Sequence, residues 1–152
     1  MQKTALFPGS FDPITKGHVD VVMKGLGIFD RIVIGIGTNT SKKALFPIEQ
    51  RMEWIRKVFA AHPTVEVHAY DGLTIGYARQ LGAKYILRGL RSGLDFEYEQ
   101  SIAFANKEME PGIETIFMLS SPSYTNISST IVRDIIINKG DYSLFVPEGI
   151  RF

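Results

Sequence analysis

Residues 4–18 read TALFPGSFDPITKGH, and this stretch decides how the chain folds. Its first four residues are mostly apolar and favour a short β-strand, and the two prolines and the glycine that follow favour a tight turn. Apolar residues then recur at Val19, Val22, Met23 and Leu26, which is the spacing of one face of an amphipathic helix. The stretch therefore predicts a strand that passes through a tight loop into the N-terminus of a helix.

The predicted loop is suited to holding a phosphate group. The N–H groups in the first turn of a helix lack partners within the helix, and the helix dipole is positive there. Ser10 adds a hydroxyl, and His18 adds an imidazole in the first helical turn. The simpler alternative is a connection in which His18 only caps or packs. The stretch has neither the Gly-Lys-Ser/Thr of a Walker phosphate loop nor the Gly-x-Gly-x-x-Gly of a dinucleotide-binding fingerprint.

The composition is that of a globular domain and excludes several classes of protein. With 152 residues, the chain fits a single domain over 1–152 that buries about 70% of its unfolded surface. Its 17 basic and 16 acidic residues give a net charge of +1, so no nucleic acid is expected as a partner. No apolar run has the length of a membrane span, and the start shows no cleavable-signal pattern, so no membrane partner is expected. The absence of cysteine excludes disulfides, thiolate catalysis and cysteine metal sites, and we interpret the chain as cytoplasmic.

Strand-like and helix-like segments alternate along the chain. Continuous or alternating apolar runs predict strands, and apolar residues at helical spacing predict helices. Five strand-then-helix units in a row indicate an α/β fold with a doubly wound, five-stranded parallel sheet and helices on both faces. The predicted strands are 4–7, 31–37, 65–69, 85–88 and 115–119, and the predicted helices are 19–26, 47–60, 73–81, 98–109 and 129–136.

Polar side chains follow each predicted strand. In a doubly wound sheet, ligands bind beyond the carboxyl ends of the strands, near the point where the strand order reverses. An arginine that closes an apolar strand needs an anionic partner, so Arg88 should face a phosphate or a carboxylate. Lys43 by itself is equally well explained as a solvated surface charge. The residues expected in one shared cleft are Ser10, His18, Lys42, Lys43, Thr74, Arg88, Arg91 and the segment 120–124.

Three motifs in this sequence resemble the signatures of one enzyme family. They are Pro8–His18, the pair Arg88–Arg91 and Asp95–Glu99, and Ile127–Thr130 followed by Arg133. The first ends in Thr15-x-Gly17-His18, which resembles the His-x-Gly-His signature of the nucleotidyltransferase superfamily with threonine in place of the first histidine. Together the motifs resemble the phosphopantetheine adenylyltransferase family over nearly the whole chain, which implies a Rossmann-like nucleotidyltransferase fold. Ser10 stands where that family has threonine, a change that keeps the hydroxyl.

The resemblance implies a reaction and a set of site residues. The implied reaction transfers the adenylyl group of ATP to 4′-phosphopantetheine and gives dephospho-coenzyme A and pyrophosphate, in coenzyme A biosynthesis. The implied catalytic residues are His18, Lys42 and Ser10, and the implied acceptor-binding residues are Ser10, Lys42, Thr74 and Arg88. The implied nucleotide-binding residues are Ser10, Phe11, His18, Gly89, Leu90, Arg91, Glu99, Tyr124, Thr125, Asn126, Ile127, Ser128, Ser129 and Thr130.

The resemblance also implies a cofactor and partners. Magnesium is expected to arrive with ATP and to bridge its phosphates, because the sequence shows no dedicated carboxylate cage for a metal ion. Dephospho-coenzyme A or coenzyme A is expected as the product or as a feedback ligand. The implied assembly is a homohexamer.

Other functions remain open beside this one. The nearest is another nucleotidyltransferase, either a cytidylyltransferase for a phosphorylated alcohol or a pyridine-nucleotide adenylyltransferase, although Thr15 and the two central motifs disfavour both. A non-catalytic nucleotide-binding module also uses a doubly wound sheet, but it does not need Lys42 and Arg88 for a second phosphate. A structural or interaction protein is the least favoured, because the distinctive residues fall in one cleft-forming set of loops.

Overall fold

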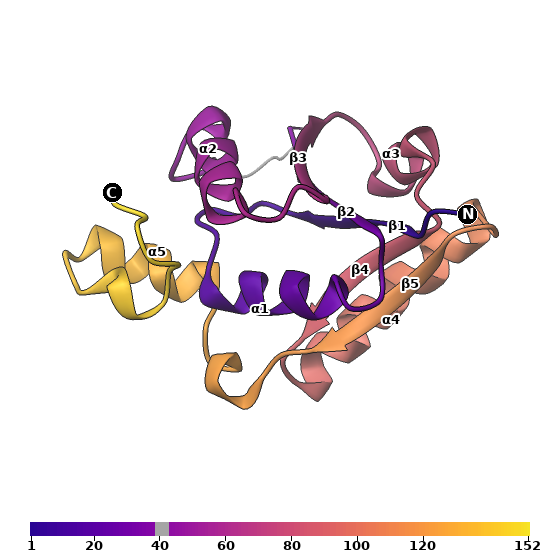
Figure 1. The fold of residues 1–152 in the computed structure, drawn as a ribbon. Coiled ribbons are helices and arrows are strands. Elements are labelled where there is room, and N and C mark those ends of the chain that lie inside the picture. The colour runs from indigo at the N-terminus through magenta and orange to yellow at the C-terminus, as the bar shows by residue number, and fades with distance from the viewer. Residues whose placement is uncertain (39–42) are drawn as a thin grey trace.

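A computed structural model describes residues 1–38 and 43–152, and its elements follow the predicted alternation (Figure 1). The strands are β1 (Thr4–Gly9), β2 (Arg31–Gly37), β3 (Val65–Tyr70), β4 (Tyr85–Leu90) and β5 (Glu114–Leu119). The α-helices are α1 (Lys16–Gly25), α2 (Ile48–Val58), α3 (Thr74–Leu81), α4 (Gly93–Met109) and α5 (Ser129–Ile137). Short 3₁₀ helices, η1 (Pro122–Tyr124) and η2 (Tyr142–Leu144), lie on either side of α5 in the chain. Each predicted strand and helix is present.

The strands form one five-stranded parallel sheet in the order β3-β2-β1-β4-β5. β1 lies at the centre, where it pairs with β2 along its whole length and with β4 at Ala5 and Leu6. The chain therefore builds outward to β3 and then returns to place β4 on the other side of β1. The prediction of a doubly wound α/β sheet is confirmed, and its switch point lies at the carboxyl ends of β1 and β4.

Helices pack on both faces of the sheet and bury two apolar cores. α1 and α2 contribute Val22 and Ile55 to the core on one face, and α3 contributes Ile75 to the core on the other (Figure 1). The adjacent residues Ala5 and Leu6 belong to opposite cores, and both are fully buried. This burial on both faces explains why the central strands read as continuous apolar runs. Within the described part of the chain, no helix has the length and apolar character needed to cross a membrane.

Helix α4 differs from its prediction in where it begins and in which residues it buries. It begins earlier than predicted, at Gly93, because the Ser92 hydroxyl accepts a hydrogen bond from the Asp95 amide and caps the first turn. The apolar stripe that predicted this helix faces outward, and Tyr98 is 70% exposed. The buried residue of α4 is instead the charged Glu99.

Gly35 in β2 allows two side chains to approach the sheet closely. A Cβ added at this position would lie 2.8 Å from Leu6 Cδ1 and 3.0 Å from a ring carbon of Tyr70. Both neighbours are buried, and the Tyr70 ring is rigid. Because Gly35 has no side chain, Tyr70 at the end of β3 can pack closely against the centre of the sheet.

We predict that Gly35→Ala lowers the free energy of unfolding by about 1–3 kcal/mol, because the new methyl group overpacks this site. Gly76→Ala is the matched control, since Gly76 lies in α3 with open space around it. Alanine forms helix better than glycine, so this control should gain about 0.5–1 kcal/mol. Urea unfolding followed by circular dichroism measures both changes. A Gly35→Ala variant as stable as the wild type would contradict the tight packing.

Candidate active site

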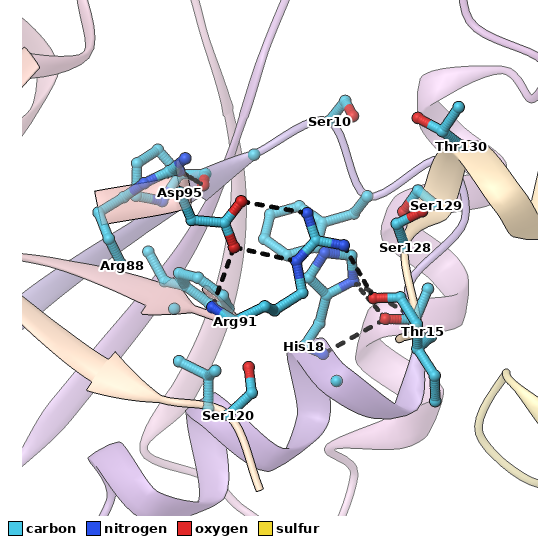
Figure 2. A pocket seen from close by; sticks show the side chains of 18 of the residues that line it. Ser10, Thr15, His18, Arg88, Arg91, Asp95, Ser120, Ser128, Ser129 and Thr130 are labelled. Carbon is cyan, nitrogen blue, oxygen red and sulfur yellow. Dashed lines mark hydrogen bonds and ion pairs between the residues drawn. The ribbon is translucent and has the colours of Figure 1, made fainter. Parts of the chain in front are cut away.

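A cavity of about 440 Å³ lies at the carboxyl ends of β1 and β4, at the switch point of the sheet (Figure 2). Its walls come from β1 and the turn after it, the first turn of α1, the end of β4, the start of α4 and the N-terminus of α5. The structure thus brings together residues that are far apart in the sequence. The predicted site residues that line this cavity are Ser10, Phe11, His18, Arg88, Gly89, Arg91, Glu99, Ile127, Ser128, Ser129 and Thr130.

The remaining predicted nucleotide-side residues do not line this cavity. Leu90 is buried within the protein. Residues 124–126 lie in the connection between β5 and α5, where the Thr125 hydroxyl donates to the Pro122 carbonyl. Lys42, predicted for both catalysis and acceptor binding, lies outside the residues that the structure describes, and its neighbour Lys43 is exposed.

His18 is held by a reciprocal capping box at the start of α1. The Thr15 side chain accepts a hydrogen bond from the His18 amide, and His18 Nδ1 lies 3.0 Å from the Thr15 amide nitrogen. A backbone amide only donates, so Nδ1 is the acceptor, and the proton of the neutral ring is on Nε2. Because His18 lines the cavity, its Nε2–H group is the donor that the ring offers to a ligand.

The surroundings of His18 keep its imidazole uncharged. Burial, followed by the positive charges of Arg88 and Arg91, lowers the pKa of His18 from 6.5 to about 4. Phe11 contributes to this burial, with its ring centroid 4.8 Å from that of His18. At neutral pH, His18 is therefore a neutral hydrogen-bond donor in a cavity whose positive charge comes from arginines.

Arg88 has its anionic partner within the protein. Its guanidinium donates from Nε to Glu99 Oε2 at 2.8 Å and from Nη2 to Glu99 Oε1 at 2.5 Å. A third hydrogen bond, 2.7 Å long, joins Nη1 to the Pro8 carbonyl. The two bonds to Glu99 make the pair bidentate, and Glu99 is only 8% exposed while the Arg88 side chain remains 30% exposed. Of the two partners predicted for Arg88, a phosphate or a carboxylate, the structure contains the carboxylate.

Arg91 joins the loop after β4 to the segment before α5. Its Nε lies 3.2 Å from Asp95 Oδ2, and its Nη1 donates to the Ile127 carbonyl at 3.2 Å (Figure 2). Gly89 supports the same wall, because a Cβ at this position would lie 2.8 Å from Val21 Cγ2. The glycine therefore allows α1 to lie closely against the end of β4.

The first turn of α5 lies at the cavity. Ser128 caps this helix by accepting a hydrogen bond from the Ile131 amide at 3.2 Å. The Ser129 hydroxyl donates to the Pro13 carbonyl at 2.8 Å, which fixes α5 to the turn after β1. Backbone N–H groups at such a helix start, together with the Thr130 hydroxyl, suit the binding of an anion such as a phosphate.

Sequence reasoning missed two residues that hold the turn after β1. The carboxylate of Asp12 is 4% exposed and accepts hydrogen bonds from the Leu45 and Phe46 amides at 2.8 and 3.0 Å. Arg51 of α2 donates to the Ser10 carbonyl at 2.6 Å. Asp12 lies within the first motif, so its position in the sequence could have identified it as a site residue. Arg51 lies on a helix and carries no such signal.

Asp20 was also missed, and it anchors the start of the segment that leads to α5. Its carboxylate accepts hydrogen bonds from the Ser121 amide and hydroxyl, each 2.9 Å long, and pairs with Lys24 at 3.0 Å. Although burial raises the pKa of Asp20, these hydrogen bonds bring it below its usual value. Helix α1 thus carries both His18 and the anchor of the segment that leads to α5.

A second cavity, of about 360 Å³, lies beside the first, between α3 and α4. Its wall is mostly apolar and includes Ile75 and Ile102. The predicted acceptor residues Ser10, Thr74 and Arg88 all line it. The residues common to both cavities are Pro8, Gly9, Ser10, Arg88 and Glu99. The Arg88–Glu99 pair is therefore part of the boundary between the two cavities.

The acidic side chains at the cavity are already paired. Asp95 is engaged by Arg91, and Glu99 is engaged by Arg88. Among residues 1–38 and 43–152, no three histidine, aspartate or glutamate side chains are grouped so that they could hold a metal ion. Binding of magnesium together with ATP stays a prediction.

Comparison with known proteins relates the whole chain to one group. Residues 6–135 match the family model described as cytidylyltransferase-like. The phosphopantetheine adenylyltransferase of Flavobacterium psychrophilum is 50% identical over 149 residues, which cover 98% of each chain. The phosphopantetheine adenylyltransferase of Bacteroides fragilis is 48% identical over 98% of this chain and 99% of its own.

A solved structure has the same fold at much lower identity. The bifunctional NMN adenylyltransferase/ADP ribose pyrophosphatase of Francisella tularensis superposes with a TM-score of 0.73 over 99% of this chain and 46% of that one. Because the identity is only 19%, this superposition establishes the Rossmann-like fold and nothing further. The relation to the two bacterial enzymes is far closer and spans nearly the full length of each. This chain belongs to the phosphopantetheine adenylyltransferase family of nucleotidyltransferases.

Proposed function

We propose that this protein catalyses the reversible transfer of the adenylyl group of ATP to 4′-phosphopantetheine, which gives dephospho-coenzyme A and pyrophosphate in coenzyme A biosynthesis. The observation that carries the proposal is the pair of adjoining cavities at the switch point, which share Ser10 and Arg88. One cavity offers a helix N-terminus and a neutral histidine to a nucleotide. The other offers an apolar pocket to the tail of a phosphorylated acceptor.

ATP is assigned to the first cavity. The N-terminus of α5, with Ser128, Ser129 and Thr130, suits its outer phosphates, because unpaired N–H groups and the helix dipole favour negative charge there. The wall from Gly89 to Arg91 is assigned to the adenine side. Magnesium bound with the nucleotide would neutralise charge on its phosphates, and the two acidic side chains at the cavity, Asp95 and Glu99, are engaged by arginines.

The chemistry needs positioned donors and no general base. The attacking phosphate oxygen of the acceptor is already anionic, so no proton has to be removed. A bond forms from this oxygen to the α-phosphorus of ATP while the bond to pyrophosphate breaks. Negative charge on the oxygens of the α-phosphate is stabilised by donors fixed beside them. His18 suits this role. The Thr15 amide donates to Nδ1, so the neutral ring has Nε2–H as its donor to a bound phosphate.

The acceptor phosphate is assigned to Ser10, Arg88 and Lys42. A guanidinium has five N–H donors, and the bonds to Glu99 and Pro8 use three of those of Arg88. Two donors remain for a phosphate oxygen without loss of the ion pair. The tail of the acceptor then follows the second cavity past Thr74, where an apolar wall suits its methylene groups.

We further propose that copies of this chain assemble through α4, as a homohexamer. Leu94 and Tyr98 lie four residues apart on one face of the helix and are 79% and 70% exposed, and Ile102, one turn further on, is 38% exposed at the edge of the second cavity. A contiguous apolar stripe of this kind marks a surface that another protein covers.

We place the enzyme in the cytoplasm, with dephospho-coenzyme A as its product and coenzyme A as a feedback ligand.

Pyrophosphate release tests the assignment of the substrates. With ATP and magnesium, we expect release when 4′-phosphopantetheine is the acceptor, and none with glycerol 3-phosphate or nicotinamide mononucleotide. Replacing ATP by CTP should also abolish release. Release with another acceptor or with CTP would move the substrate assignment to another nucleotidyltransferase. ATP binding without release in any combination would favour the non-catalytic module.

Replacing His18 tests the proposed donor. We predict that His18→Ala lowers turnover by about 10²–10³, because one fixed donor to the developing charge is lost. The dissociation constant of ATP, measured by calorimetry, should change little by comparison. His62→Ala is the control, since this histidine lies outside both cavities and should leave turnover unchanged. Near-normal turnover of His18→Ala would remove the residue from the mechanism.

The low pKa of His18 also predicts a pH dependence of stability. Between pH 6.5 and about 4, the unfolded chain binds a proton at this residue that the folded chain excludes. The free energy of unfolding therefore falls as the pH falls through this range. His18→Gln removes the group, so its urea midpoint should depend less steeply on pH than that of the wild type. Parallel pH curves for the two proteins would contradict the buried, neutral state.

A further inference from the structure

A row of hydrogen-bonded and stacked side chains runs from the sheet edge at β3 to the acceptor cavity, and the mechanism above does not use it. The Tyr70 hydroxyl lies 2.8 Å from Thr74 Oγ1. The Tyr70 ring stacks on the Tyr77 ring, with centroids 4.7 Å apart and planes 3° from parallel. Both Tyr70 and Thr74 line the second cavity, and neither lines the first. This places the row on the acceptor side of the site.

Tyr70 has little freedom to move. Tyr70 is the last residue of β3, and it is 8% exposed. A Cβ on Gly35 would lie 3.0 Å from the ring, and one on Gly37 would lie 3.6 Å from the hydroxyl oxygen. Because Gly35 and Gly37 of β2 have no side chains, the Tyr70 ring packs directly against the strand. A hydroxyl on so constrained a ring holds a fixed position in the cavity wall.

The Tyr77 ring on the other side is fixed as well. Arg31 donates to both carboxylate oxygens of Glu66, at 2.7 and 2.9 Å. Glu66 Oε2 lies 2.9 Å from His68 Nε2, and His68 Nδ1 lies 2.7 Å from the Tyr77 hydroxyl. A carboxylate only accepts, so Nε2 donates to Glu66, and Nδ1 shares a second hydrogen bond with the Tyr77 hydroxyl. These bonds hold the ring that stacks on Tyr70.

Either hydroxyl could donate in the bond between Tyr70 and Thr74, and we assign Tyr70 as the donor on the basis of acidity. A phenol is a stronger acid than an aliphatic alcohol and is therefore the stronger hydrogen-bond donor. With Tyr70 as donor, Thr74 Oγ1 accepts, and the hydroxyl proton of Thr74 can be directed to another acceptor. Thr74 is half-buried at the first position of α3, on the cavity wall. A carbonyl oxygen of a bound ligand is a suitable partner for that proton.

We propose that Tyr70 is a positioning residue for the acceptor substrate: it fixes the Thr74 hydroxyl so that Thr74 donates to an amide carbonyl in the tail of the acceptor. The proposal rests on the proposed function, which places the tail in the second cavity. Tyr70 acts through Thr74 and is remote from the nucleotide cavity. Its loss should therefore weaken binding of the acceptor while the binding of ATP and the chemical step are retained.

Steady-state kinetics with 4′-phosphopantetheine and ATP tests this assignment. A neutral hydrogen bond contributes about 0.5–1.5 kcal/mol, so we expect Tyr70→Phe to raise KM for the acceptor about 2- to 12-fold. The values of kcat and of KM for ATP should stay close to those of the wild type. Thr74→Val, which removes the hydroxyl, should show the same split, and Thr74→Ser, which keeps it, should retain the wild-type KM. Tyr85→Phe, at the opposite end of the sheet, is the matched control without effect.

The double variant distinguishes positioning from simple loss of packing. If Tyr70 acts through Thr74, then Tyr70→Phe combined with Thr74→Val should be no worse than Thr74→Val alone. Multiplicative effects, an unchanged acceptor KM in Tyr70→Phe, or an equal rise in KM for ATP would each overturn the proposal. A wild-type enzyme without acceptor-dependent pyrophosphate release would overturn the proposed function and this assignment together. An active wild type beside an unaffected Tyr70→Phe would overturn the assignment alone.

Discussion

The hydrogen bond from the Thr15 amide to His18 Nδ1 joins the formation of the first helix to the chemistry of the site. It completes the capping box of α1, a role usually filled by the carboxylate or amide of glutamate or glutamine. The same bond uses the accepting nitrogen of the ring, so the proton lies on Nε2. Protonation of Nδ1 would break the bond, and the low pKa of His18 prevents this near neutral pH. One local interaction therefore fixes the tautomer of His18, the residue that we propose as the donor in catalysis, and favours its neutral form.

The N-terminal end of α5, to which we assign the outer phosphates of ATP, is positioned by hydrogen bonds within the protein. β5 is an edge strand of the sheet, and the chain after it returns past α1 to reach the switch point. Asp20 holds the beginning of this return at Ser121, and the Ser129 hydroxyl holds its end at the Pro13 carbonyl. Anchoring at both ends places the helix N-terminus before substrate binds. Donors placed in advance need no reorganisation during the reaction, which is what makes them effective.

Periodicity and the rule that places ligands at the carboxyl ends of parallel strands predicted the strands, the helices and four residues of the first cavity, Ser10, His18, Arg88 and Arg91. The other predicted residues of that cavity, such as Phe11 and Glu99, came from the family resemblance. Pairings between distant segments were not predictable in this way. Nothing in the sequence indicated that Glu99 would pair with Arg88, or that Tyr70 would reach Thr74 from the end of β3. The apolar stripe at Tyr98 predicted a helix but not that its face would lie exposed. Periodicity predicts an amphipathic helix and does not say whether its own chain covers the apolar face.

The Arg88–Glu99 pair also explains how one arginine can serve a site where two anionic substrates meet. The guanidinium of Arg88 is partly withdrawn from water, so a charged partner for it stabilises the free enzyme. In the proposed mechanism, an arginine without Glu99 would hold a phosphate tightly in substrate and product alike. Such uniform binding lowers KM without raising kcat. With part of its donors committed to Glu99, Arg88 would orient the acceptor phosphate, and stabilisation of the transition state would fall to donors such as His18 Nε2–H.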